Sequence, residues 1–508
     1  MPRAPRADSL PSPGGEGILI SNRIAVALIV AVAVATRIVS WWNPVAHVDD
    51  QFYMLAGQEL LNGHWPYLDV WDRKPLGLFL IYAGIAAIGG KPILAMNLVA
   101  TAFAATTAVI VRQIALRFAS PASALFAAIT YLVVLPLYGG QNGQSPVFYN
   151  LFIAGAVLLL FRASEAGRKA VVARSAYAAM LLCGLAMTVK QTSFVEGCFV
   201  GLAFLWLMRR NGATAIGICA HAVAMVATAL APTWLCFFSY WLAGPQAAYE
   251  FVYANYISIF QRQSWSPLAR LGGFGLLLLY LFPLFIMAGI GAVTRWKAAK
   301  AQLSTKLLIG WLAAAFLGYL AVPAFFDHYA LPLVAPLCVA VAIFYDSRSG
   351  RLFFGGYMVF CLIQGSILGW RDNRDEAARY ELIRRTVDGA RYGGCLYVAD
   401  GPSRLYSDFP ECRPTRYLFP DHLVLITESN AVGVDTAGEL GRILAGRPEV
   451  VVTRKARIGR QPVEIRTILA RTLARDYRPV LRTPSGYSQS VDDLTVWQRQ
   501  DLPPPAVR

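Results

Sequence analysis

Residues 24–75 read IAVALIVAVAVATRIVSWWNPVAHVDDQFYMLAGQELLNGHWPYLDVWDRKP. The apolar part, residues 24–42, is close to the roughly 20 residues that a helix needs to cross a bilayer. Charged side chains then gather within a short distance, from Asp49 and Asp50 to Asp72 and Lys74. Ionisable groups are costly inside lipid and are usually functional when they occur near it. The stretch therefore predicts a membrane span followed by a functional loop at the membrane edge.

The composition of the whole chain supports a membrane protein with many spans. Its 508 residues are 56% hydrophobic and only 15% charged. This balance is too apolar for an ordinary soluble protein. The net charge of +16 does not indicate nucleic-acid binding, because many basic residues fall in short clusters between apolar runs, as topology signals do.

We predict an all-α polytopic fold with about eleven spans between residues 24 and 370. The basic clusters, including the N-terminal tail 1–23 and Arg348/Arg351, then all lie on the cytoplasmic side of the cell membrane. This path requires that residues 76–90 form a short re-entrant or interfacial helix, and a twelve-span path remains open because short apolar runs are ambiguous. The outer segments 43–92, 139–147, 190–191, 243–270 and 327–328 should converge on one face.

The last part of the chain, residues 371–508, has a different composition. Short β-like runs near residues 395–399 and 450–453 alternate with helix-like stretches at 374–388 and 462–475. We predict a small α/β domain outside the membrane. Of the eight cysteines, only Cys395 and Cys412 lie outside apolar runs, and an oxidising exterior permits a disulfide between them.

The paired acids of the first outer loop suit a general base. Adjacent helical residues point about 100° apart, so Asp49 and Asp50 cannot address one atom equally. One of them is then expected to act and the other to support it. The alternative is that one of them only caps the helix expected over residues 51–62.

Basic residues on the outer side suit a phosphate. Arg73 and Lys74 are side chains that hold phosphates, although a pair that merely reaches the membrane edge is the alternative. Lys190, at a later outer turn, is either a second phosphate contact or a helix-end anchor. His328 beside Asp327 either contacts substrate or is simply hydrated. The aromatic segment 249–265 is expected to lie on the outer surface as an interfacial anchor, and a gate for the lipid donor is the alternative.

The first loop resembles that of the GT-C glycosyltransferases. The resemblance rests on Asp49-Asp50 with Tyr53, on Pro66-Tyr67 and Asp69, on Trp71-Asp72 with Lys74-Pro75, and more weakly on Lys190-Gln191 and Asp327-His328. It is closest to the branch that holds the lipid A aminoarabinose transferase, the rhizobial lipopolysaccharide galacturonosyltransferases and the protein O-mannosyltransferases, and it covers residues 24–370.

The resemblance implies transfer of a sugar from a polyprenyl-phosphate donor to a hydroxyl of a cell-envelope glycan, a lipid or a protein. Asp49 matches the catalytic acid and would be the base, Lys74 matches the lysine on the donor phosphate, and Asp50 and Tyr53 match supporting positions. Asp69 and Asp72 belong to the same loop and are expected to contact substrate. One base and no second carboxylate imply inversion of the anomeric centre.

The next outer segment departs from the family pattern. Residues 139–146 carry no acid, so a metal shared between two loops is not expected, and Asn142 and Gln144 are candidate substrate contacts or ordinary turn residues. No cofactor is predicted to be required. The one position considered for a divalent cation is Asp49/Asp50, and adjacent acids alone form a poor cage.

Two other classes of protein fit parts of the sequence. A transporter or flippase for a lipid-linked saccharide would place polar groups near the bilayer midplane between repeated halves, whereas these acids lie in an outer loop. A membrane scaffold whose outer domain binds a partner would not need Asp49 or Lys74.

Overall fold

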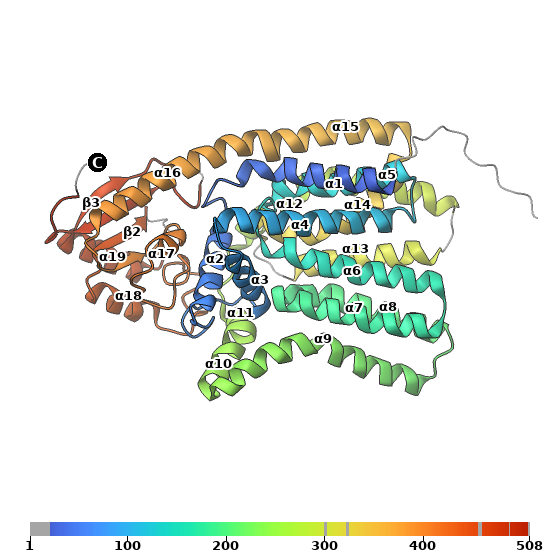
Figure 1. Cartoon of the computed structure of the whole chain (residues 1–508), viewed down its shortest axis with the longest axis horizontal. Helices are drawn as coiled ribbons and strands as arrows, with labels where there is room; N and C mark the ends of the chain where they lie inside the picture. The colour runs from blue at the N-terminus through green and yellow to red at the C-terminus, as the bar shows by residue number, and fades with distance from the viewer. Residues whose placement is uncertain (1–20, 299–301, 322–324, 456–459, 487, 506–508) are drawn as a thin grey trace, which may run out of the picture.

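Long parallel and antiparallel helices occupy most of the chain, and a small mixed domain follows them (Figure 1). This computed structural model describes residues 21–298, 302–321, 325–455, 460–486 and 488–505. Most of the N-terminal tail predicted to be cytoplasmic, residues 1–20, lies outside the described residues.

The helical bundle matches the predicted number of spans. Among the described residues, ten helices are long and apolar enough to cross a membrane, or eleven if the bent helix α12 counts as one. Length and composition are thus those of a multi-pass membrane protein. The bundle helices are α1 (Asn22–Arg37), α4 (Pro92–Ala115), α5 (Pro121–Val134), α6 (Ser145–Ala166), α7 (Lys169–Val189), α8 (Phe194–Arg210), α9 (Ala215–Ala243), α12 (Pro267–Ala298), α13 (Leu303–Leu320), α14 (Leu331–Tyr345) and α15 (Arg348–Leu362).

Local sequence signals set the ends and the close contacts of these helices. Ser120 accepts a hydrogen bond from the amide of Ser123, and Pro121 takes the first helical position of α5. Helix α7 approaches α9 at Gly184, where a Cβ atom would lie 2.2 Å from the carbonyl oxygen of Ala229. Small residues allow such close packing of helices in a membrane.

Two short helices, α2 (Val48–Leu61) and α3 (Leu76–Ala87), lie at the end of the bundle that faces the C-terminal domain (Figure 1). Helix α3 is apolar but has only 12 residues, fewer than a crossing requires. It packs closely on α2, since a Cβ at Gly57 would lie 2.5 Å from the backbone of Tyr82. This agrees with the prediction that residues 76–90 do not make a full crossing.

The aromatic segment after α9 is helical but broken. It consists of α10 (Pro245–Val252), a π-helical stretch η4 (Tyr253–Ile257) and α11 (Ser258–Gln261). A π-helical stretch is uncommon and often marks a functional site. Residues of this segment line the central cavity described below, so it does more than rest on a surface.

The C-terminal domain is α/β, as predicted. Its sheet has the order β1-β2-β4-β3, with β1 and β2 parallel and the other pairs antiparallel. Cys395 and Cys412 form a disulfide. The elements are β1 (Leu396–Val398), α17 (Arg404–Asp408), α18 (Thr436–Ala445), β2 (Val450–Arg454), α19 (Val463–Asp476), β3 (Tyr477–Arg482) and β4 (Leu494–Arg499).

One helix joins the bundle to this domain without a break. Helix α15 continues through the π-helical stretch η6 (Ile363–Leu368) into α16 (Gly369–Ala390), which reaches the sheet (Figure 1). The domain boundary proposed from composition, at residue 371, falls inside α16. The change in composition there marks the point where the helix leaves its apolar surroundings, and the backbone hydrogen bonds continue past it.

The C-terminal domain is held against the first outer loop by hydrogen bonds and ion pairs. The amide of Trp71 donates to the carbonyl oxygen of Arg416 at 2.8 Å. The carboxylate of Glu428, which is 2% exposed, pairs with Arg73 at 2.6 Å and with Arg262 at 2.7 Å. A buried carboxylate between two guanidinium groups therefore joins three distant parts of the chain.

We expect Glu428→Gln to loosen this contact. Removing one charge of a buried ion pair leaves its partners uncompensated and costs about 3 kcal/mol or more. The variant should unfold at a lower temperature than the wild type, and protease should release the C-terminal domain faster. Glu464→Gln, at an exposed glutamate of α19, is the matched control and should behave as wild type. Equal stability of the two variants would show that the Glu428 pairs do not hold the domain.

Candidate active site

Asp49 and Asp50 begin α2 and point to different partners. The helix cap is His47, whose Nδ1 accepts the amide hydrogen of Asp49 at 3.2 Å, so neither acid is the cap. Both carboxylates lie in the first turn, where the helix dipole favours negative charge. Their different directions follow from the helical angle between neighbouring residues.

The Asp50 side chain is buried against the second outer segment. Its Oδ2 atom accepts a hydrogen bond from the amide of Gly143 at 3.0 Å. Burial raises the pKa of Asp50 to about 7, although His47, the Gly143 hydrogen bond and Arg37 oppose the shift. Asp50 therefore ties α2 to residues 139–144, which is a supporting position.

The Asp49 side chain faces the central cavity. Its Oδ2 atom accepts a hydrogen bond from Nε2 of Gln144 at 3.1 Å and lies 3.9 Å from Nε2 of His328. Burial alone would raise the pKa of Asp49, but Lys74, His47, His328 and the Gln144 hydrogen bond outweigh it and lower the pKa below its usual value. The carboxylate of Asp49 is thus ionised and lines the cavity.

The second half of the first loop is a tight turn that positions Lys74. Asp69 accepts a hydrogen bond from the amide of Trp65 at 2.7 Å, and Asp72 accepts one from the amide of Lys74 at 2.9 Å. Tyr67 adopts φ of +70° and donates its hydroxyl to the carbonyl oxygen of Lys74 at 2.8 Å. A non-glycine residue at positive φ costs free energy and is found where surrounding contacts impose it.

Lys74 is held as a cation inside the cavity wall. Its Nζ atom lies 5.1 Å from the centre of the Tyr53 ring. Burial would lower the pKa of Lys74, but the carboxylates of Asp49 and Asp72 outweigh burial and raise it. The ring of Tyr53 therefore stabilises the ammonium group of Lys74 through a cation–π contact.

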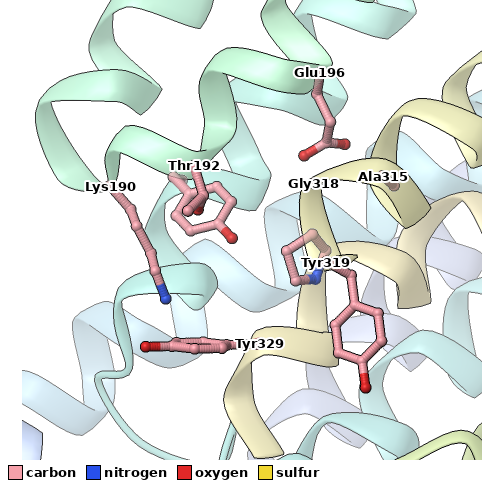
Figure 2. A pocket seen from close by; sticks show the side chains of 9 residues that line it. Lys190, Thr192, Glu196, Ala315, Gly318, Tyr319 and Tyr329 are labelled. Carbon is pink, nitrogen blue, oxygen red and sulfur yellow. The ribbon is translucent and has the colours of Figure 1, made fainter. Parts of the chain in front are cut away.

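Lys190 reaches the same space from the end of α7. Figure 2 shows its side chain extended toward Tyr329, and its Nζ atom lies 4.0 Å from the centre of that ring. Burial and the charge of Lys74 lower the pKa of Lys190 to about 7, although Asp49 opposes the shift. Beside it lies a small pocket of about 20 Å³ that also contacts Thr192, Glu196 and Tyr319, with room for about one water molecule.

These side chains surround one cavity of about 590 Å³ at the end of the bundle. This volume is in the range of small-molecule sites. Every predicted outer segment contributes to it or contacts a residue that does. Of the predicted site residues, the cavity is lined by Asp49, Asp72, Arg73, Lys74, Lys190 and His328.

The other predicted site residues do not line this cavity. Asp50 and Tyr53 support it from behind, and Asp69 shapes the turn. Gln144 contacts it through its hydrogen bond to Asp49. Asn142 is buried, and its carbonyl oxygen accepts a hydrogen bond from Arg37 at 3.3 Å.

Several cavity residues were not predicted. Arg262 lies in the aromatic segment 249–265, and its being the single basic residue of that segment was the available signal. The C-terminal domain contributes two carboxyls, an imidazole, a phenyl ring and three uncharged polar side chains, none of which belongs to a local motif. These residues are Phe419, Asp421, His422, Glu428, Ser488, Gln489 and Ser490.

The C-terminal domain adds a buried acid to the cavity wall. Burial and the nearby carboxylates of Asp400 and Glu428 raise the pKa of Asp421 to about 7, and Arg262 opposes the shift. Burial and the charges of Arg73, Lys74 and Arg262 keep the pKa of His422 well below its usual value. The domain is therefore part of the cavity wall, to which it contributes the acid Asp421, the imidazole of His422 and the ion-paired carboxylate of Glu428.

Comparison with known proteins identifies the fold. No family model matches the chain, and no curated protein sequence matches it. The crystal structure of ArnT from Cupriavidus metallidurans bound to undecaprenyl phosphate matches 94% of this chain and 98% of its own, with a TM-score of 0.60 and 14% identity. The chain has the GT-C fold. ArnT in the apo state matches with a TM-score of 0.58, 14% identity, and 93% and 97% coverage.

The GT-C match extends past the bundle into the C-terminal domain, because it covers 94% of the chain. The Saccharomyces cerevisiae protein O-mannosyltransferase Pmt1-Pmt2 complex matches only 46% of this chain and 35% of its own, with a TM-score of 0.36 and 19% identity. The fold expected from the first loop is thus confirmed by ArnT, and the resemblance reaches further along the chain than the motifs did.

Proposed function

We propose that this protein is a membrane glycosyltransferase that moves a sugar from a polyprenyl-phosphate donor to a hydroxyl group of a cell-envelope acceptor. The observation that carries the proposal is that a carboxylate, Asp49, and an ammonium group, Lys74, line the same cavity at the end of an apolar bundle. A lipid-linked donor needs a membrane for its tail, a cation for its phosphate and a base for the incoming hydroxyl.

The proposed reaction is a single displacement. Asp49 accepts the proton of the acceptor hydroxyl as its oxygen attacks the anomeric carbon, and the bond from that carbon to the phosphate oxygen breaks. The polyprenyl phosphate leaves as an anion, so no acid has to protonate it. With one base and no covalent sugar intermediate, the anomeric centre is inverted.

The cations of the cavity divide into two groups. Lys74 and Lys190 reach the open space and are the proposed contacts of the donor phosphate, in a water-poor site where such charges act strongly. Arg73 is ion-paired with Glu428, and its Nε atom donates a hydrogen bond to Oγ of Ser258 at 3.2 Å. Arg73 would therefore have to break these contacts in order to bind the donor phosphate. His328, beside Asp49, lines the part of the cavity where the acceptor or the sugar is proposed to lie.

Transfer of labelled sugar tests the proposal. Full-length protein in lipid nanodiscs is given a panel of polyprenyl-phosphate sugars together with acceptor fractions from cell envelope: lipopolysaccharide, other glycans and protein. We expect transfer from at least one donor, with a product of opposite anomeric configuration by NMR. No transfer from any such donor, with active transfer from nucleotide sugars, would overturn the donor class.

The pH dependence of kcat/KM for the donor should follow the protonation state of Lys190. Below its pKa of about 7 this lysine is charged, and above it the charge and its attraction for phosphate are lost. A phosphodiester donor keeps its single negative charge throughout this range, so kcat/KM for the donor should fall as pH rises through neutrality. Lys190→Arg stays charged and should move the fall to higher pH. An identical fall in both proteins would assign it to another group.

A further inference from the structure

Three side chains of metal-ligating types lie close together in the cavity wall. His47, Asp327 and His328 each offer one ligand atom, and these atoms all lie within 4.8 Å of one another. They come from two parts of the chain: His47 caps α2, whereas Asp327 and His328 begin the short helix η5 (Asp327–Ala330) before α14. The grouping is therefore created by the fold.

A glycine leaves room for an ion between these side chains. Gly139 has φ of +67°, and a Cβ atom built on it would lie 3.5 Å from Oδ2 of Asp327 and 3.6 Å from Nε2 of His47. Both atoms thus face the same space beside the Gly139 backbone. Any other residue would place a side chain there, in a backbone conformation that favours glycine.

The His328 ring is fixed in orientation. Its Nδ1 atom lies 3.2 Å from Oδ1 of Asp327, and its ring packs edge-on against Tyr329 and parallel to Phe326. Histidine ligands of metal sites are commonly oriented by a carboxylate in this way. The Oδ1 atom of Asp327 serves this contact, and its Oδ2 atom faces the space beside Gly139.

Two imidazoles and one carboxylate are the ligand set of zinc-class ions, whereas Mg²⁺ and Ca²⁺ prefer oxygen ligands alone. Ligand atoms around a tetrahedral zinc ion lie about 3.4 Å apart, given bonds of about 2.1 Å. The present atoms, which lie within 4.8 Å of one another, have to move closer by up to about 1.4 Å to reach this spacing. Asp327, whose side chain is 53% exposed, is free to make this movement.

The geometry points to a binding site for one divalent ion of the zinc class, held by His47, Asp327 and His328. The ion replaces the proton on Nε2 of His47 and joins the start of α2 to the turn before α14. Asp49, 3.9 Å from His328, stays outside the ligand set and keeps its place beside the cavity. This site differs from Asp49/Asp50, the one position at which the sequence left a divalent cation open.

Zinc uptake by full-length protein tests the site. The protein carries an affinity tag without histidine, its free thiols are alkylated, and it is stripped with chelator in detergent before titration with Zn²⁺. We expect one ion per chain by elemental analysis, not displaced by excess Mg²⁺, and a higher thermal unfolding temperature with zinc than without. Neither donor nor acceptor is present, so the outcome is independent of the proposed transfer reaction.

Three variants test whether the bound zinc is held by the proposed ligands. His47→Ala and Asp327→Asn should each weaken zinc binding by at least about tenfold. His64→Ala, which removes a half-exposed histidine of the same loop, should bind as wild type. Asp327→Asn changes an exposed side chain of the same shape, so it reports on the ion even if His47→Ala fails to fold. The site is overturned if stripped wild type takes up no zinc, or if Asp327→Asn binds zinc as tightly as wild type.

Discussion

Asp49→Asn should lower sugar transfer by about 10²- to 10⁴-fold, the usual contribution of a general base. The substitution keeps the size of the side chain and its hydrogen bond from Gln144, but an amide cannot take the proton of the acceptor hydroxyl. The loss should appear in kcat, because the proton moves only as the reaction proceeds. Single-turnover transfer with donor bound in advance is the measurement that separates this step from binding.

Two neighbouring acids provide the controls. Asp69→Asn changes a carboxylate of the same loop that only accepts a backbone hydrogen bond, so transfer should stay within a few-fold of wild type. Asp50→Asn keeps the acceptor for the Gly143 amide and should cost much less than Asp49→Asn. If Asp50→Asn abolished transfer in a folded protein and Asp49→Asn did not, the roles assigned to the two acids would be reversed.

The number of spans and the first loop were predictable because the signals are local. An apolar run of sufficient length has to be buried or to cross lipid, and α1 and α4 to α9 follow from such runs. The short helix α3 was predictable from its length and from the charge pattern around it. Helical geometry predicted only that Asp49 and Asp50 point in different directions, and the resemblance assigned the role of base to Asp49. The structure places Asp49 in the cavity wall and Asp50 behind it.

The contribution of the C-terminal domain to the cavity was not predictable. Glu428 pairs with Arg73 and Arg262, which are far from it in sequence, so no local pattern could reveal the contact. The same holds for the meeting of His47 with His328. The aromatic segment was expected to rest on a surface because its periodicity is that of an amphipathic helix, but Arg262 at its end turns toward the cavity.

Lys74→Met should lower transfer by about 10²- to 10³-fold, comparable to the loss of one charge-stabilising group in other active sites. The ammonium group of Lys74 lines the cavity, and the charge on the leaving phosphate grows as the bond to the sugar breaks. Both kcat and the donor KM should worsen, since the phosphate is charged before and during the reaction. Steady-state transfer over a range of donor concentrations measures both.

Two further substitutions, compared with Lys74→Met, test whether the positive charge at position 74 is required for transfer. Lys91→Met removes an exposed lysine before α4 and should have no effect. Lys74→Arg keeps the charge but changes the shape of the group, and should recover part of the activity. Because Asp49 and Asp72 raise the pKa of Lys74, removing the ammonium group also removes the main charge that lowers the pKa of Asp49. A folded Lys74→Met protein with unchanged donor KM would show that the phosphate binds elsewhere, with Lys190 as the remaining lysine of the described cavity lining.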